Sequence, residues 1–277
     1  MLVGNIYLCR LIFNLDNENR LKLIFTKSMS IKVLKVELSE ILSLRNLFLQ
    51  ENNFQIRYNA CHERGWTDSY ILIHNNKKIG YGSVRGKENH ADRDSVFEFY
   101  IVPPYRNIAS IAFQELLHVC AATFIECQSN DFLLTSLLYQ FGENINAEVI
   151  LFGDNTKTLL KSENVIFRKA KDDDIMFEHK AEPEGDYVLA MNNEIIASGG
   201  FLLHYNKPFA DLYMEVKEDH RKKGYGSFLI QEIKNECYIA GRVPAARCNI
   251  DNVASRSTLL KAGLSIAGYL LLGKVRA

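Results

Sequence analysis

Arg221-Lys222-Lys223-Gly224-Tyr225-Gly226 joins a predicted strand at residues 210–216 to a predicted helix at residues 227–238. Its two glycines let the main chain curl so that several N–H groups converge, and the helix N-terminus adds partial positive charge. The turn therefore predicts an anion site shaped for a phosphate or pyrophosphate, although a basic solvated turn has the same composition. It lacks both the Walker pattern G-x-x-x-x-G-K-[ST] and the third glycine of a dinucleotide fingerprint.

A second polar stretch, Asp251-Asn252, lies after the strand that follows this helix. Residues 244–250 predict a strand, and Asp251-Asn252 after it predicts the start of another helix. Gly263 predicts the left-handed residue that ends this helix, and residues 268–275 predict a closing strand. The anion-binding turn is thus followed by a capped helix in the same fold unit.

In order and on these elements, the two stretches resemble the GNAT superfamily of N-acetyltransferases. Arg221-x-x-Gly224-x-Gly226 is similar to the family's acetyl-CoA pyrophosphate loop, and Asn252-x-x-Ser255 to its second cofactor segment. The resemblance covers residues 165–277 and implies that acetyl-CoA is the cosubstrate. It implies these cofactor-binding residues: Val216, Arg221, Lys222, Lys223, Gly224, Tyr225, Gly226, Ser227, Asn252 and Ser255.

The resemblance also implies transfer of an acetyl group to a primary amine. Main-chain N–H near Val216 would polarise the thioester carbonyl, where the strands ending at Val216 and near Asn249 splay apart. An ammonium acceptor must first lose a proton, and Glu215 is the first candidate for its general base, ahead of Asp211 and His204. Alternation along the strand favours a plainer interpretation, in which Glu215 lies on a solvated face.

One position departs from the family pattern. Leu259 stands where the family often has a tyrosine that protonates the departing thiolate, which leaves the general acid unassigned. A thiol with a pKa of about 8.5 is a tolerable leaving group without such help. The departure also motivates an alternative function, a catalytically silent acyl-CoA-binding or interaction module.

The chain contains an internal repeat. Residues 69–83 and 186–200 align with identical residues at six positions, and each predicts a β-hairpin around an Asn-Asn turn. A strand and a helix are predicted after each hairpin, at residues 96–102 and 109–120 in the first copy. That copy has no glycine between Gly86 and Gly142, so only the second copy can bring bare backbone amides close to a ligand.

These patterns predict an α/β fold with a mixed sheet, built as two tandem GNAT-like domains. We expect an N-terminal extension at residues 1–29, a degenerate domain at 30–155 that supplies part of the acceptor cleft, and an acetyl-CoA-binding domain at 160–277. The boundary is expected in the polar stretch at 153–164. Met29 is as good a natural start as Met1, because residues 30–37 predict the first strand.

Composition restricts the partners. The 277 residues carry 33 basic and 33 acidic side chains, whereas nucleic-acid binders usually have a basic excess, so neither nucleic acid nor membrane is expected as a partner. Six cysteines without a C-x-x-C pair favour reduced thiols and a cytoplasmic location, and the scattered histidines predict no metal site. The expected partner is a small-molecule or peptide amine. The chain is expected to be a monomer with an internal pseudo-dimer, or a homodimer.

Overall fold

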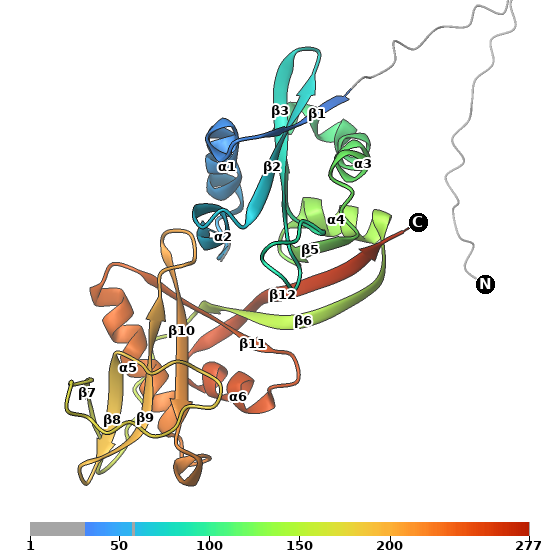
Figure 1. Ribbon diagram of the computed structural model, residues 1–277. Helices are drawn as coiled ribbons and strands as arrows, with labels where there is room; N and C mark the ends of the chain where they lie inside the picture. Colours follow the sequence, from blue (N-terminus) through green and yellow to red (C-terminus); the bar gives the residue numbers. More distant parts are fainter. Residues whose placement is uncertain (1–30, 57–58, 277) are drawn as a thin grey trace, which may run out of the picture. The chain divides into compact units, whose positions relative to one another are not determined.

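The computed structural model describes residues 31–56 and 59–276, drawn in colour in Figure 1. The N-terminal extension expected at residues 1–29, with the alternative start at Met29, lies outside them. We call residues 31–154 the N-terminal half and residues 155–276 the C-terminal half. No helix among the described residues is long and apolar enough to cross a membrane.

The two halves contain the same elements in the same order, apart from two helices near the start of the first. The N-terminal half has β1 (Ile31–Val36), α1 (Leu38–Asn52), α2 (Asn59–Glu63), β2 (Thr67–His74), β3 (Lys77–Arg85), β4 (Ser95–Ile101), α3 (Ala109–Cys120), β5 (Phe124–Gln128), α4 (Phe132–Phe141) and β6 (Gly142–Asp154). The C-terminal half has β7 (Ile166–Lys169), β8 (Tyr187–Met191), β9 (Glu194–Leu202), β10 (Phe209–Val216), α5 (Tyr225–Ile239), β11 (Val243–Asn249), α6 (Val253–Lys261) and β12 (Leu264–Val275).

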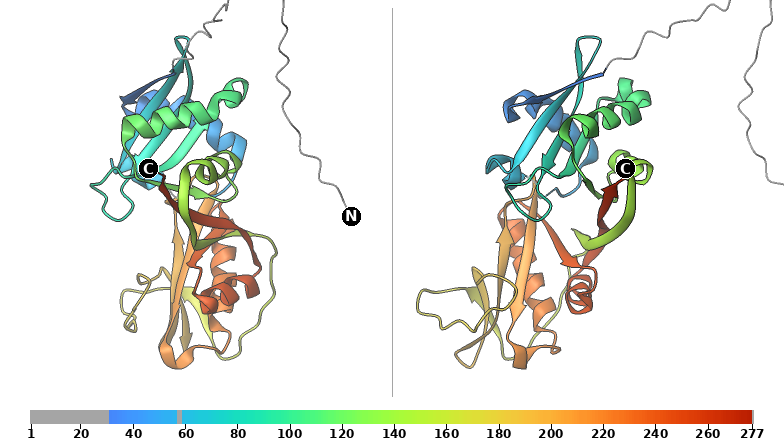
Figure 2. Two further views of the ribbon diagram at one scale, coloured as in Figure 1. Left: turned by 90° about the vertical axis from the view of Figure 1, so that its right-hand side faces the viewer. Right: turned by 45° about the vertical axis from the view of Figure 1, so that its right-hand side comes forward.

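All of these strands form one mixed sheet in the order β1-β2-β3-β4-β5-β12-β6-β11-β10-β9-β8-β7. If each strand is replaced by the corresponding strand of the other half, the same order reads backwards. A pseudo-twofold axis therefore passes between β12 and β6, which lie side by side in the middle of the sheet (Figure 2). The predicted α/β fold with two tandem copies is confirmed.

The halves exchange their last strands. β6 ends the N-terminal half but pairs with β11 of the C-terminal half, from Ala245 opposite Gly153 to Asn249 opposite Val149. β12 ends the C-terminal half but pairs with β5, from Leu270 opposite Gln128 to Lys274 opposite Phe124. Gly153, which the sequence placed in the boundary region, is thus part of a central strand. The sequence did not predict this exchange.

Both predicted hairpins are confirmed, and their turns explain the asparagine pairs. Asn75 and Asn76 join β2 to β3 with φ of 48° and 62°, and Asn192 and Asn193 join β8 to β9 with φ of 49° and 66°. Two successive positive φ angles are what a tight two-residue hairpin requires, and asparagine tolerates them better than most residues.

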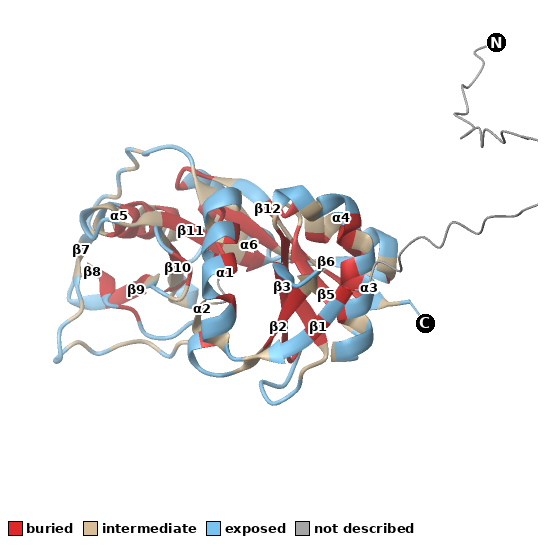
Figure 3. Ribbon diagram, turned by 90° about the horizontal axis from the view of Figure 1, so that it is seen from above, coloured by how far each residue is buried: buried red, intermediate tan, exposed pale blue. Residues whose placement is uncertain are grey.

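Different elements cover the two faces of each half. In β2, Tyr70 and Leu72 pack in the core beneath α3, while Ile71 packs in the core beneath α1, so helices cover both faces (Figure 3). In the C-terminal half α5 covers one face. Residues 170–186 run over the other face of the sheet, and they form no helix. One face of β10 is therefore covered by a loop and not by a helix.

The stretch between the halves is fixed to α5 by two buried side chains. The Lys234 ammonium donates to the carbonyl oxygens of Thr156 at 2.8 Å and Ala262 at 3.1 Å, and lies 2.9 Å from an Asp154 carboxylate oxygen. Gln231 binds both the N–H and the carbonyl of Leu160. The domain boundary at residues 155–160 stays a prediction, but the chain there is held in place along its length.

Candidate active site

β10 and β11 run parallel and then diverge. They pair over residues 209–211 and 243–245 and separate toward their C-terminal ends, as the sequence analysis predicted. The N–H of Lys217 donates to the carbonyl of Ile196 in β9 at 2.9 Å. Because successive residues of a strand direct their N–H groups to opposite sides, the N–H of Val216 is directed away from β9, toward the space between β10 and β11.

The glycine turn follows β10 and opens α5. Lys222 and Gly224 both have positive φ, 61° and 87°, and Gly224 precedes the first helical residue. The N–H of Phe228 makes a helical bond to the carbonyl of Gly224 at 3.1 Å. The N–H groups of residues 225–227 lie before that bond, at the positive end of the helix dipole, and are placed to bind an anion.

The two glycines serve different purposes. A Cβ at Gly226 would lie 3.1 Å from Met214 Cε and 3.3 Å from Thr258 Cγ2, so this position has little space for a side chain. A Cβ at Gly224 would meet only Lys261 Nζ at 3.7 Å, and there the left-handed conformation is what requires glycine. The α6 residue Lys261 thus adds a cation to the turn. Lys261 was not among the site residues predicted from the sequence.

The basic side chains of the turn differ in what they contact. Arg221 donates from Nε to the carbonyl of Val216 at 2.9 Å, and its Nη2 lies 3.4 Å from a Glu215 oxygen. Lys223 donates to the carbonyl of Asp219 at 2.9 Å. Arg221 and Lys223 therefore brace the turn, whereas the exposed side chain of Lys222 has no hydrogen bond or ion pair with the described residues. All three contribute positive charge at the predicted pyrophosphate position.

The second predicted cofactor segment begins α6 beside β11. Asn252 Oδ1 accepts the N–H of Ser255 at 2.9 Å, which confirms the predicted helix cap. Burial raises the pKa of the Cys248 thiol on β11, and the neighbouring Ser255 side chain opposes the rise. Leu259 is buried in the core of the C-terminal half, so nothing at this position could protonate a thiolate. Tyr225 and Ser227, also predicted to bind the cofactor, lie in the first turn of α5.

Glu215 is buried and accepts several backbone hydrogen bonds. Its oxygens accept the N–H groups of Lys180, Ala181 and Glu182 at 3.0–3.1 Å. Burial alone would raise the pKa of Glu215, but these bonds, with the nearby His179, hold the pKa below its usual value. Glu215 thus fixes residues 180–182 over β10. Its predicted role as general base remains a prediction, and a lowered pKa makes a carboxylate a weaker base.

Four other groups lie on the same side of the diverging strands. Asp211, the last β10 residue paired with β11, lies 2.9 Å from His204 Nε2 and 3.2 Å from Arg247 Nε. The side chain of Glu182 is exposed, and partial desolvation and the charge of Asp211 raise its pKa, while Arg247 opposes the rise. Arg247 and Glu182 were not predicted as site residues, since neither belongs to a recognisable motif.

The corresponding place in the N-terminal half is filled by the protein itself. β4 and β5 also diverge after two paired positions, but Glu98 there is buried against Arg45, His62 and Tyr81. The hollow that remains beside Glu98 has a volume of about 10 Å³. That is room for about one water molecule, not for the arm of a cofactor.

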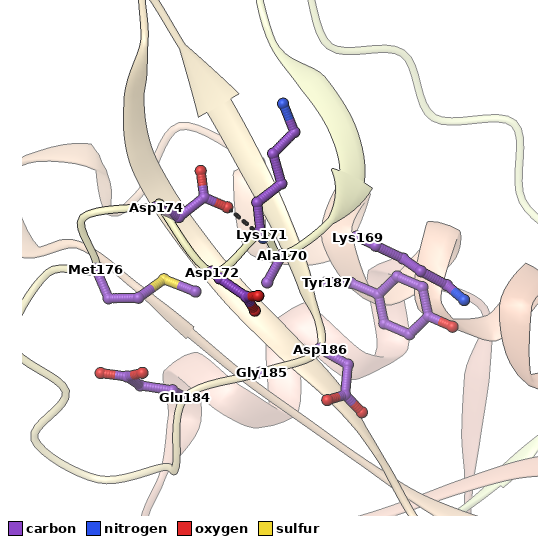
Figure 4. A pocket seen from close by; sticks show the side chains of 10 residues that line it. All are labelled: Lys169, Ala170, Lys171, Asp172, Asp174, Met176, Glu184, Gly185, Asp186 and Tyr187. Atoms are coloured by element: carbon purple, nitrogen blue, oxygen red, sulfur yellow. Dashed lines mark hydrogen bonds between the residues drawn. The ribbon is translucent and has the colours of Figure 1, made fainter.

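A larger hollow of about 640 Å³ lies at the outer edge of the C-terminal half (Figure 4). It is formed by residues 169–176 and 184–187, beside β7 and β8, which β9 and β10 separate from β11. It is therefore distinct from the diverging strands. Among the described residues, no cluster of His, Cys, Asp and Glu side chains has an arrangement that could hold a metal ion.

Comparison with known proteins agrees with this geometry. Residues 155–264 match the model of the Acetyltransferase (GNAT) family, while no curated protein matches the sequence. A GNAT-family acetyltransferase from Colwellia psychrerythraea has a similar structure, with a TM-score of 0.69 and 14% identity, over 88% of this chain and 100% of that one. A GCN5-related N-acetyltransferase from Sphaerobacter thermophilus has a TM-score of 0.55 and 11% identity, over 89% and 96%.

A third similar structure is a tandem GNAT protein from the clavulanic acid biosynthesis pathway, with a TM-score of 0.53 and 9% identity, over 90% of this chain and 99% of that one. At these identities the structural likeness establishes the fold, and it extends over both halves. The residues that match the family model include the glycine turn and the diverging strands β10 and β11. Members of this family transfer acyl groups from acyl-CoA. The chain is thus a tandem GNAT-fold protein, and its residues 155–264 match the GNAT acetyltransferase family.

Proposed function

We propose that the C-terminal half is an N-acetyltransferase that moves an acetyl group from acetyl-CoA to a primary amine. The observation that carries this proposal is the glycine turn at the end of β10, where N–H groups of residues 225–227 converge beside two strands that diverge. An anion site next to such a gap suits a ligand that carries a pyrophosphate and a long narrow arm. Acetyl-CoA has this form and supplies the activated acetyl group.

The binding roles follow from the contacts around the turn. The amides of Gly226 and Ser227 and the exposed side chain of Lys222 would bind the pyrophosphate, with Lys261 adding charge from α6. The N–H of Val216 would donate to the thioester carbonyl and stabilise the negative charge that develops there. The other predicted residues shape this surface: Arg221, Lys223, Gly224, Tyr225, Asn252 and Ser255.

The N-terminal half, as a degenerate domain at 30–155, would supply structure and one wall of the acceptor site. Two contacts support this role: Ile56 N–H donates to Asn206 Oδ1 at 2.6 Å, and Asn206 N–H donates to the carbonyl of Ile56 at 2.9 Å. Asn206 follows His204, which lies against Asp211. The acceptor would be a small-molecule or peptide amine, and we place the protein in the cytoplasm as a monomer or homodimer.

Leu259 favours a second candidate function. Because this core residue stands in place of the family's tyrosine, the domain can be a silent acyl-CoA-binding or interaction module. Release of free CoA thiol from acetyl-CoA, measured across a broad panel of primary amines, separates the two functions. Amine-dependent release supports the transferase, whereas tight binding without any release supports the silent module.

Calorimetric titration of acetyl-CoA into the wild type and a Gly224→Val variant tests the binding site. Valine at a φ of 87° distorts the turn, and we expect binding at least about 100-fold weaker, since the converging amides supply most of the anion affinity. Gly241→Val is the matched control, because Gly241 also has positive φ and an open surrounding, but at the far end of α5. Unchanged binding by Gly224→Val contradicts the pyrophosphate assignment.

A further inference from the structure

One face of β10 carries three polar side chains beneath residues 180–184. Asp211, Tyr213 and Glu215 alternate along the strand and so share this face, while α5 packs on the other. Glu215 accepts the N–H groups of residues 180–182, and the Tyr213 hydroxyl donates to the carbonyl of Glu184 at 3.4 Å. Residues 180–184 are therefore attached to β10 at both ends of this short stretch.

The carboxylates on this side differ in their accessibility. Glu215 is buried with its oxygens occupied by backbone N–H groups, and Asp211 is buried against Arg247 and His204. The exposed carboxylate of Glu182 has no hydrogen bond or ion pair with any residue in the described part of the chain, although its backbone is fixed by Glu215. Glu182 is thus held in place but remains available to a ligand.

Position favours the same residue. The glycine turn and α5 occupy one face of β10, so an acceptor must reach the diverging strands from the other face, where residues 180–184 lie. We propose that Glu182 takes the proton from the acceptor ammonium, and that Glu215 positions Glu182 by holding residues 180–182. This inference rests on the proposed transferase function and gives the role of general base to a different residue.

The charges around Glu182 make it a stronger base than an ordinary glutamate. Partial desolvation and the negative charges of Asp211 and Glu215 raise its pKa, and Arg247 on β11 opposes them. The Tyr213 hydroxyl also lies on this face, and His204 faces Asp211 from the loop before β10. Asp211 is paired with Arg247 and Glu215 lies near Arg221, so the unpaired Glu182 carboxylate is the charge that favours an acceptor arriving as a cation.

The step balances without another reactant. An N–H bond of the ammonium breaks and its proton passes to the Glu182 carboxylate, which frees the nitrogen lone pair. The new C–N bond forms as the C–S bond of the thioester breaks, and the electron pair leaves on the CoA sulfur. The second proton lost by the nitrogen neutralises the thiolate, and Glu182 returns its proton to water.

The test is the pH profile of kcat/KM, from pH 5.5 to 9.5, with acetyl-CoA and a primary amine that supports thiol release in the wild type. We expect Glu182→Gln to lower kcat/KM about 100-fold at neutral pH, a typical contribution of a general base. The acidic limb of the Glu182→Gln profile should move to higher pH, toward the pKa of the free amine. Glu182→Asp should recover part of the loss, and Glu184→Gln, two residues away on the same stretch, should match the wild type.

Glu215→Gln separates positioning from catalysis. This substitution should raise KM and lower kcat, because residues 180–182 lose their hydrogen bonds to Glu215. Its pH profile should keep the acidic limb of the wild type, since Glu182 is still present. A wild-type rate and profile in Glu182→Gln overturns the inference, as does an acidic limb lost in Glu215→Gln but kept in Glu182→Gln. If the wild type releases no thiol with any amine, the proposed function itself fails, and the inference fails with it.

Discussion

The two halves share a topology but differ at the end of the fourth strand. In the C-terminal half Gly224 and Gly226 open α5, whereas Ala109 and Ile111 stand at the corresponding positions of α3. The correspondence is structural, because Arg106 and Arg221 both donate from Nε to the carbonyl of the last strand residue, Ile101 or Val216. A GNAT-like half can therefore keep its sheet, helix and strand-end arginine without an anion-binding turn.

The halves also differ in what covers the diverging strands. Helix α1 places Arg45 and Phe48 over β4, and Glu98 beneath them binds Arg45, whereas an irregular stretch covers β10. A buried ion pair needs to be complete to be tolerated, so the N-terminal half depends on this network for its stability. Buried side chains thus fill the space beside β4, whereas the corresponding face of β10 is covered only by an irregular stretch, and this difference leads to four predictions.

The largest expected effect concerns Arg45. Burial would raise the pKa of Glu98, but Arg45 and His62 keep the pKa far below its usual value, so Glu98 is charged. Arg45→Met leaves that charge poorly compensated, and we expect the free energy of unfolding to fall by about 3–5 kcal/mol. Chemical denaturation measures it. Arg45→Met combined with Glu98→Gln should recover most of the loss, and a fully stable single variant would show that the network is not essential.

A pH-dependent difference is expected at the helix caps. Asp131 caps α4 where Asn252 caps α6, and burial raises the pKa of Asp131 to about 6. A folded pKa above the unfolded value means that the contribution of this group is full below about pH 4 and is lost as the pH rises through 6. The free energy of unfolding of Asp131→Asn should therefore rise, relative to that of the wild type, by up to about 3 kcal/mol between pH 4 and 7.5.

Unfolding free energies of the wild type and Asp131→Asn at a series of pH values measure this gain. Asn252→Asp is the matched control in the other half, and it should gain no such pH dependence because its side chain is exposed. Parallel pH curves for the wild type and Asp131→Asn would contradict the prediction.

The third prediction concerns Lys234, which stands on α5 where α3 has the exposed Val119. Lys234→Met leaves the carbonyls of Thr156 and Ala262 and an oxygen of Asp154 without their donor. We expect a loss of about 2–3 kcal/mol in the free energy of unfolding. Lys157→Met nearby removes only an exposed ammonium above the Tyr238 ring and should cost about 0.5 kcal/mol. Equal effects would show that the fixed linker adds little stability.

The smallest effects are expected at the paired arginines. Arg106→Lys and Arg221→Lys each lose one arm of a guanidinium that binds a strand carbonyl and a carboxylate, Glu51 or Glu215. Each should lower stability by about 0.5–1 kcal/mol. In calorimetry, Arg221→Lys should weaken acetyl-CoA binding only about threefold, a change of less than 1 kcal/mol. A loss near 100-fold would mean that Arg221 binds the cofactor directly, and the two arginines would no longer be comparable.

Local chemistry made much of the fold predictable. Asn75-Asn76, the glycine turn and Gly263 with its φ of 85° follow from conformations that few residues tolerate. The Asn252 cap follows from a short side chain whose oxygen can accept a backbone N–H at a helix start. α1 was not predicted, because the buried Arg45 interrupts its apolar face. The exchange of β6 and β12 was not predictable either, since strand patterning shows which face is buried but not which strand lies alongside.

The candidate site divides in the same way. Its glycine turn follows from short-range sequence, and the structure places Gly224, Ser227 and Asn252 on the predicted elements. Its acceptor side depends on contacts between distant segments, such as Glu215 with residues 180–182, which no local pattern reveals. The sequence therefore located the turn but gave no sign of Glu182.

The exchanged strands bear on how such a chain can arise and be divided. Two separate single-domain subunits that traded their last strands would form the same sheet, so the fused chain is equivalent to a strand-swapped dimer with a covalent tether. Tethering makes assembly independent of protein concentration and fixes the ratio of the copies at one to one. In such a chain one copy can change the residues at the end of its fourth strand and still pair its last strand with the other copy. Cutting the chain at residue 155 would leave β5 and β11 each bound to a strand from the other fragment.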